Sequence, residues 1–391
     1  MYTHTPTIFN QLLRFVPRPT FDSFVGQHNI DKYVKRFSAW NLFTVMTYAQ
    51  ATGKDSLSDI VDSLPVHDNL HYHLWLSTVK RSTLAYANNR VNHELFEQLF
   101  YHMLSLCKQY DPHNKFSLWY DVYSLDATVV SVSLQLIQRA KYRTRKGAIK
   151  MHVLLHNKSS LPELITITDG KQGDVTIGKL MDIENRLTPD SIVVFDRAYV
   201  DYKRWARLHE KWISFVIRMK KNVDYLVEEV LPVNESRILK DEIITIFNPN
   251  SKNVYKERLR RIEYYHTEEW KTYVFLTNNF ELSARHVALI YKNRWQIELF
   301  FKRIKQHLKI KHFLWCSENA VKNQIWTAMI YYLIVCYIKF KTNSTASLLQ
   351  LTRILSESFM MKLKIIDILG LTSKYIASLQ PRWSPQQLSL L

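Results

Sequence analysis

The chain has 391 residues, 47% of them hydrophobic, which is enough apolar material for two or three domains and excludes a largely disordered protein. Lysine and arginine outnumber the acidic residues by 53 to 35, and the resulting net charge of +18 indicates a polyanionic partner, above all nucleic acid. The seven glycines form no Gly-rich phosphate loop, which argues against an ATP-driven mechanism.

The cysteines and the apolar runs indicate a protein of the cytoplasm. Cys107, Cys316 and Cys336 are widely spaced and none belongs to a CxxC pair, so neither a disulfide framework nor a zinc site is predicted. The N-terminus lacks the basic and apolar regions of a signal peptide. The most apolar run, 325–338, is shorter than the roughly 20 residues that span a bilayer. We expect it to form a buried core helix, and we expect no membrane association.

Residues 1–110 are predicted to be helical. Apolar residues recur at helical intervals over 32–51, and serines are placed to cap two further helices, of which the second covers 83–106. Short helices ending in a capped helix with a basic flank are typical of a helix-turn-helix DNA reader, with an ordinary helical bundle as the alternative. The candidates for base contacts are Arg81, Asn88 and Arg90.

A carboxylate lies in the middle of the first predicted strand. The β-branched, alternating segment 122–130 predicts a strand with Asp126 between Ser124 and Thr128 on one face. A charge at such a position needs a partner, because burying it alone is costly. The partner is either a metal ion or a Lys or Arg side chain. Asp121 competes for the same role and points to the opposite face if the strand is continuous.

A basic run follows in 138–147, where five of ten residues are Lys or Arg. Such a run is either a solvated hairpin tip or a clamp for phosphates beside an active site. In the second case Arg143, Arg145 and Lys146 contact the DNA. Strands are then predicted at 150–155 and 163–168, and a helix at 177–185.

The second candidate carboxylate ends a buried strand. Four apolar residues, 192–195, predict a central strand, and Asp196 emerges at its carboxyl end, followed by Arg197 and Tyr199. Open α/β sheets place their functional groups at this end. Capping of the following helix is the alternative role for Asp196.

A further strand is predicted at 212–218, and short β-prone pieces separated by turns then continue over 222–285. This pattern predicts a β-rich insertion ahead of the next helical segment. Trp270 lies within it and is either a core residue or a ring that stacks on an unpaired base.

The segment 290–310 carries the third carboxylate. It contains Tyr291, Arg294, Glu298 and Lys305 in a Y-x2-R-x3-E-x6-K spacing. On one helix these four project into an arc about 60° wide, beside an apolar stripe that packs. A solvated helix face with ion pairs four residues apart is the alternative.

This spacing, together with the FDRAY sequence around Asp196, resembles the DD-E transposases of the insertion-sequence-four group, and the similarity extends over nearly the whole chain. The resemblance implies a ribonuclease-H-like α/β core interrupted by a β-rich insertion. The expected boundaries are 1–110 for a helical N-terminal DNA-binding domain, 115–221 and 286–345 for the two parts of the core, 222–285 for the insertion and 346–391 for a helical C-terminal segment.

The resemblance also implies roles for single residues. Asp126, Asp196 and Glu298 are expected to be catalytic and to bind metal. Three carboxylates on separate elements can hold two divalent ions, and their hard oxygen atoms favour Mg²⁺ or Mn²⁺ over zinc. The expected DNA-binding residues are Tyr291, Arg294 and Lys305, to which the sequence patterns add Arg197, Arg143, Arg145, Lys146 and Trp270.

The implied reaction is cleavage at the terminal inverted repeats of an insertion sequence through a hairpin, followed by transfer of the 3′-hydroxyls into target DNA. A homodimer that pairs two ends, at the bacterial nucleoid, is expected. Trp75 and Trp315 depart from the pattern, because the resemblance leads us to expect glycine there. Two alternatives stay open: a catalytically silent DNA-binding protein derived from a transposase, and a ribonuclease-H-like nuclease without strand transfer.

Overall fold

The computed structural model describes residues 5–67, 74, 79–112, 120–131, 148–169, 181–220, 222–247, 255–307 and 317–369. The chain divides into two compact units. The helical unit consists of Met1–Asn114, Val132–Lys146 and Arg303–Leu391, and the sheet unit consists of Lys115–Ser131 and Gly147–Lys302. The predicted DNA contacts Arg143, Arg145 and Lys146, and the departures Trp75 and Trp315, lie outside the described residues.

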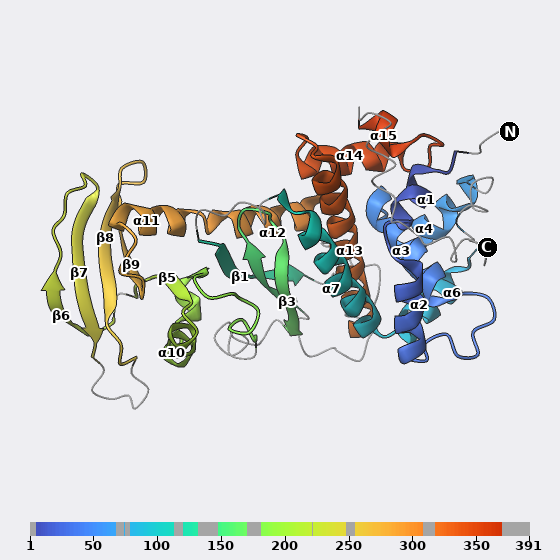
Figure 1. Ribbon diagram of the computed structural model, residues 1–391. Helices are drawn as coiled ribbons and strands as arrows, with labels where there is room; N and C mark the ends of the chain where they lie inside the picture. The colour runs from blue at the N-terminus through green and yellow to red at the C-terminus, as the bar shows by residue number, and fades with distance from the viewer. Residues whose placement is uncertain are drawn as a thin grey trace. The chain divides into compact units, whose positions relative to one another are not determined.

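The helical unit is built around one long helix, which lies beside α7 (Figure 1). This helix, α13, runs from Glu318 to Thr342 and is buried on almost every side, as expected for a helix that is apolar all round. The predicted core helix is thereby confirmed. The other helices are α1 (Ile8–Leu13), α2 (Arg18–Gln27), α3 (Ala39–Thr52), α4 (Leu57–Ser63), α6 (Arg81–Arg90), α7 (His93–Tyr110), α14 (Leu348–Ser358) and α15 (Ile365–Ile368).

The predicted base contacts in this unit need correction. The helix predicted at 83–106 is two helices, α6 and α7, separated at Val91 and Asn92. Asn88 is fully buried, and its side-chain oxygen accepts a hydrogen bond of 2.8 Å from Asn323 on α13. Arg90 donates to the backbone oxygens of Ile30 and Phe37. Asn88 therefore holds helices together and cannot reach a base, whereas Arg81 remains exposed.

The sheet unit contains a nine-stranded sheet with the order β3-β2-β1-β4-β5-β9-β8-β7-β6. β1, β4 and β5 are parallel to one another, and β2 is antiparallel to both of its neighbours. The strands are β1 (Val122–Ser131), β2 (Ala148–His156), β3 (Pro162–Asp169), β4 (Ile192–Phe195), β5 (Ser214–Arg218), β6 (Tyr225–Val230), β7 (Ile238–Ile246), β8 (Leu259–His266) and β9 (Lys271–Thr277).

A 3-2-1-4-5 order in which only the second strand is reversed is that of a ribonuclease-H-like core, so the predicted α/β class is confirmed. The β-prone pieces of the predicted insertion are β6–β9. They continue the core sheet from β5, because β9 pairs antiparallel with β5 through Val216 and Thr277. Whether they form a domain of their own stays a prediction.

Among the described residues of this unit, α10 (Tyr202–Glu210) and α11 (Ala284–Lys292) are helices that lie wholly within it, whereas α12 (Trp295–His307) begins in this unit and its residues from Arg303 belong to the helical unit. The ring of Trp205 on α10 stacks on Phe215 of β5, with centroids 4.9 Å apart. Val287 of α11 joins a buried cluster with Ile262 and Phe275, which fixes α11 against the extended part of the sheet. The helix predicted at 177–185 is wrong for 181–185, which contain a bend and the start of a turn, and 177–180 lie outside the described residues. None of the helices in the described part combines the length and apolar character needed to cross a bilayer.

Candidate active site

Two of the predicted carboxylates are neighbours across the parallel pair β1–β4. Leu125 of β1 is the register partner of Phe195 of β4, and Asp126 and Asp196 are the residues that follow them. Adjacent strands lie about 4.8 Å apart, so equivalent positions on them are close together. Asp121, the rival of Asp126, lies before β1 and its carboxylate is 3.5 Å from the buried His156 ring. Register therefore explains why two acids 70 positions apart in the chain share one edge of the sheet.

Glu298 is linked to the first acid by a single guanidinium group. Arg294 Nη1 lies 3.1 Å from Asp126 Oδ2, and Nη2 donates to Glu298 Oε1 on α12. All three side chains are partly buried, with between 20% and 35% of their surface exposed. Arg294 and Glu298 form the ion pair four residues apart that the sequence predicts. Arg294 thereby links Glu298 on α12 to Asp126 on β1.

The predicted single helix over 290–310 is wrong at its first turn. α11 ends at Lys292 and α12 begins at Trp295, and the intervening backbone forms tighter bonds, from Arg294 N to Tyr291 O and from Gln296 N to Asn293 O, both of 3.0 Å. The local tightening leaves Tyr291 on α11, where its ring packs on Phe275 with centroids 4.8 Å apart. Tyr291 and Glu298 therefore lie on different helices.

The acids influence one another electrostatically. The pKa of Asp126 is raised to about 6, chiefly by burial and to a smaller extent by the charges of Asp196 and Glu298, while the Ala127 N–H and Arg294 oppose the shift. The pKa of Tyr291 is raised to about 12, chiefly by burial and also by the charge of Asp196, while Arg294 and Arg218 oppose the shift. The three carboxylates and Tyr291 therefore occupy one electrostatic neighbourhood, and perturbed pKa values of this kind are common at functional sites.

The donor chemistry fits a hard divalent cation, but the arrangement is closed by Arg294. Within the described residues, no three His, Cys, Asp or Glu side chains are gathered into a group that could hold a metal ion. The guanidinium of Arg294 lies between Asp126 and Glu298 and forms an ion pair with each of them instead. Carboxylate oxygens favour hard divalent cations over zinc. The residues therefore fit such an ion once the arginine withdraws.

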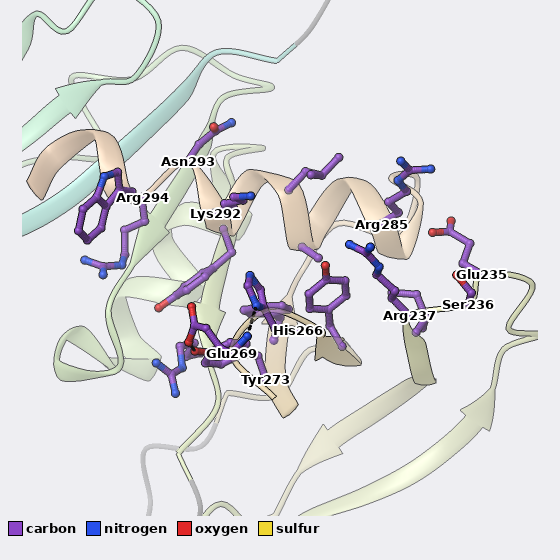
Figure 2. Close-up of a pocket in the computed structure, with 18 of the residues that line it drawn as sticks. Glu235, Ser236, Arg237, His266, Glu269, Tyr273, Arg285, Lys292, Asn293 and Arg294 are labelled. Atoms are coloured by element: carbon purple, nitrogen blue, oxygen red, sulfur yellow. Dashed lines mark hydrogen bonds between the residues drawn. The ribbon is translucent and has the colours of Figure 1, made fainter. Parts of the chain in front are cut away.

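A cavity of about 1100 Å³ extends from Glu298 and Arg294 along α11 (Figure 2). Arg218, the last residue of β5, lines it, with its guanidinium 4.6 Å from the ring centroid of Tyr273. The sequence reasoning missed Arg218. Arg218 could have been predicted from the strand pattern. It ends β5, which is parallel to β4, and functional groups gather at the carboxyl ends of parallel strands.

The remaining predicted residues differ in where they lie. Arg197 is exposed beside Asp196, whose carboxylate accepts from the Arg197 N–H at 2.7 Å. Tyr199 is buried, with its hydroxyl 3.3 Å from His152 Nδ1. Trp270 is 81% exposed in the turn between β8 and β9, so its interpretation as a core residue is wrong. Lys305 follows on α12 but belongs to the helical unit.

Comparison with known proteins decides the family. Residues 117–334 match the family model of the transposase DDE domain. The chain belongs to the DDE transposase family. The match covers β1, β4 and α12, and therefore all three candidate carboxylates. Residues 4–76 of the transposase match a second family, a domain of unknown function.

Relatives carry the same assignment. A protein of Sinorhizobium fredii named as a transposase is 31% identical over 68% of this chain and 74% of its own. A Geobacillus stearothermophilus protein, named as a transposase for the insertion sequence element IS5377, is 26% identical over 70% of this chain and 72% of its own. Among solved structures, the piggyBac transposase synaptic complex with hairpin DNA is similar at 10% identity and a TM-score of 0.48, over 97% of this chain and 83% of that one.

Proposed function

We propose that this insertion-sequence transposase binds the terminal inverted repeats of its element, cuts the DNA at their ends and joins the freed 3′-hydroxyls to target DNA. The observation that supports this most is the carboxylate pair placed by the β1–β4 register, with Glu298 joined to it through Arg294. Membership of the insertion-sequence-four group stays a prediction that the Y-R-E-K residues support.

Asp126, Asp196 and Glu298 would hold Mg²⁺ or Mn²⁺ through their oxygen atoms. When bound, two such ions activate an attacking hydroxyl or water and stabilise the departing 3′-oxygen. The protein supplies the position of the acids: two are fixed by rigid neighbouring strands and the third by α12. No covalent intermediate with a side chain is required.

The cations around the acids are suited to orient the substrate phosphates. Arg294 and Arg218 offer guanidinium groups on the cavity wall, and a guanidinium can bind a phosphate through two parallel hydrogen bonds. Tyr291 would contact the terminal nucleotide, between Arg294 and Arg218. Arg197 is exposed beside Asp196 and is proposed as another contact to the DNA. Lys305 and the basic run 138–147 are proposed as further phosphate contacts. A homodimer that pairs two ends is part of the same proposal.

Trp270 provides a test of hairpin formation that is separate from cleavage. Its exposed ring is proposed to stack on a base that leaves the duplex, so Trp270→Ala should slow hairpin formation roughly tenfold, since one base–aromatic stack contributes about 1–3 kcal/mol. The melting temperature should stay within about 1 °C of wild type, because an exposed side chain packs little. Gel analysis of nicked and hairpin products over time measures both steps. Equal rates for the variant and wild type would exclude the stacking role.

The decisive experiment for the reaction uses a linear duplex that carries the terminal inverted repeat of the native element. We expect nicks, hairpin ends and, with a second duplex present, joined products when Mg²⁺ is added, and none of these in EDTA. Binding without any metal-dependent product would identify a silent DNA-binding protein. Cleavage without joining would identify a nuclease.

A further inference from the structure

We propose that the cavity beside the acids holds a short single-stranded run of DNA, with its phosphates on Arg237, Arg285 and Lys292 and its bases against Tyr264 and Tyr273. This inference rests on the proposed function and extends it. The strand would continue from the phosphate at the carboxylates, along α11, toward the start of β7.

The cavity is elongated and begins at the catalytic end. Figure 2 shows Arg294 at one end and Arg237 and Arg285 at the other, with Tyr273 between them. Arg285 and Lys292 are seven residues apart on α11, which places them about two turns apart on one side of the helix. A DNA strand that leaves the acids would therefore meet Lys292 near the acids, and Arg237 and Arg285 at the far end of the cavity.

The charge on the walls is that of an anion site. Five cations line the cavity against three carboxylates. Arg237, Arg285 and Lys292 are exposed, and none of them forms an ion pair with any residue that the structure describes. Of the carboxylates, Glu269 accepts a hydrogen bond from the Tyr273 hydroxyl, and Glu298 is paired with Arg294. Glu235 is the third. Unpaired positive charge therefore lies at both ends of the cavity: Lys292 is close to Arg294, and Arg237 and Arg285 are at the end away from the acids.

Aromatic rings lie along the sheet side of the cavity. Tyr264 of β8 is the register partner of Tyr273 of β9, and both rings lie near His266, with centroids 6.3 and 6.1 Å from it. All three side chains are only partly buried. Cations that follow a groove, together with rings on which bases stack, are the combination found in proteins that bind single strands.

The ring-lined wall favours a single strand over a duplex, because paired bases are stacked inside a duplex and cannot lie against a protein ring. A volume of about 1100 Å³ also exceeds the roughly 300–1,000 Å³ of a typical small-ligand pocket, so it can hold more than one nucleotide. Cations contact phosphates and rings contact the faces of any base, so we expect binding in the cavity to be independent of base sequence.

The test measures binding without cleavage. A fluorescein-labelled single-stranded oligonucleotide with the terminal-repeat sequence is titrated with full-length protein in EDTA, and anisotropy is followed at several salt concentrations. The test variant is Arg237→Gln/Arg285→Gln. The matched control is Lys240→Gln/Arg258→Gln, which removes the same charge from two exposed positions that do not line the cavity, one on β7 and one directly before β8.

We expect the test variant to bind the single strand roughly tenfold more weakly, and the slope of log K against log salt to fall by about 1.4, because each phosphate contact on a single strand contributes about 0.7. The salt slope of the control variant should differ from the wild-type slope by less than about 0.7. Equal losses in both variants, or no loss in either, would overturn the inference, as would a test variant that loses affinity for duplex DNA alone.

A second variant, Tyr264→Leu, separates stacking from charge: it should weaken binding roughly five- to hundredfold with an unchanged salt slope. Thermal melting checks that each variant is folded. Mg²⁺-dependent cutting of the terminal-repeat duplex is measured separately. If the duplex is cut normally but single-strand binding does not depend on the cavity residues, this inference is rejected and the proposed function stands. If the single strand binds through the cavity but no duplex is cut, the proposed function is rejected and strand binding in the cavity stands.

Discussion

We expect Asp196→Asn to lower the rate of metal-dependent DNA cleavage by at least about a thousandfold and to retain binding of the terminal repeat. A bound metal ion contributes several kcal/mol of charge stabilisation in the transition state, and each 1.36 kcal/mol corresponds to a factor of ten in rate. Asparagine keeps the oxygen that accepts from the Arg197 N–H, so the turn after β4 is preserved and only the charge is lost. Single-turnover cleavage and gel-shift assays measure the two properties separately.

The control for this substitution is Asp121→Asn. Asp121 competes with Asp126 on sequence grounds, but it contacts His156 and lies outside the group formed with Arg294. Its substitution should leave the cleavage rate within about twofold of wild type. A loss equal to that of Asp196→Asn would show that the acids have been assigned wrongly.

Asp126→Asn is expected to stabilise the metal-free protein at neutral and higher pH, at the cost of activity. Burial raises the pKa of Asp126 to about 6 from its ordinary value of 3.8, so the folded protein binds this proton more tightly than the unfolded chain does. The resulting stabilisation is fully present below about pH 3.8 and is lost as the pH rises through about 6. Asparagine is neutral at every pH and avoids this loss.

The variant should therefore exceed wild type in free energy of unfolding by about 2–3 kcal/mol near pH 8, and the difference should shrink toward zero near pH 4. Denaturant titrations across this pH range, in EDTA, measure the effect. A variant that is less stable than wild type near pH 8 would show that the pairing of Asp126 with Arg294 outweighs its burial.

The strands that carry the acids could be predicted because local pattern and burial agree there. Four buried apolar residues followed by Asp196 describe a central strand and its functional end, and the alternation around Asp126 describes β1. The pairing of Arg294 with Glu298 follows from helical spacing alone. These features are encoded within a few neighbouring residues.

The remaining features depend on contacts between distant segments. The sequence pattern predicts the β-prone pieces after residue 222 but not that β9 pairs with β5, which places Tyr273 beside Arg218. The break between α11 and α12 has no Pro or Gly to mark it. Asn88 looks like a surface residue until Asn323 of α13 is placed against it. Strand register decides the first of these features and tertiary packing the last, and one sequence displays neither.

The proposed reaction requires Asp126, Asp196 and Glu298 to form one site for divalent cations. The most direct measurement is an anomalous-scattering map of crystals of the protein bound to terminal-repeat DNA and Mn²⁺. We predict two manganese peaks about 3.5–4 Å apart, coordinated by all three carboxylates, with Arg294 withdrawn from Asp126. A map in which any of the three carboxylates coordinates no ion, or in which Arg294 still bridges Asp126 and Glu298, would contradict the account.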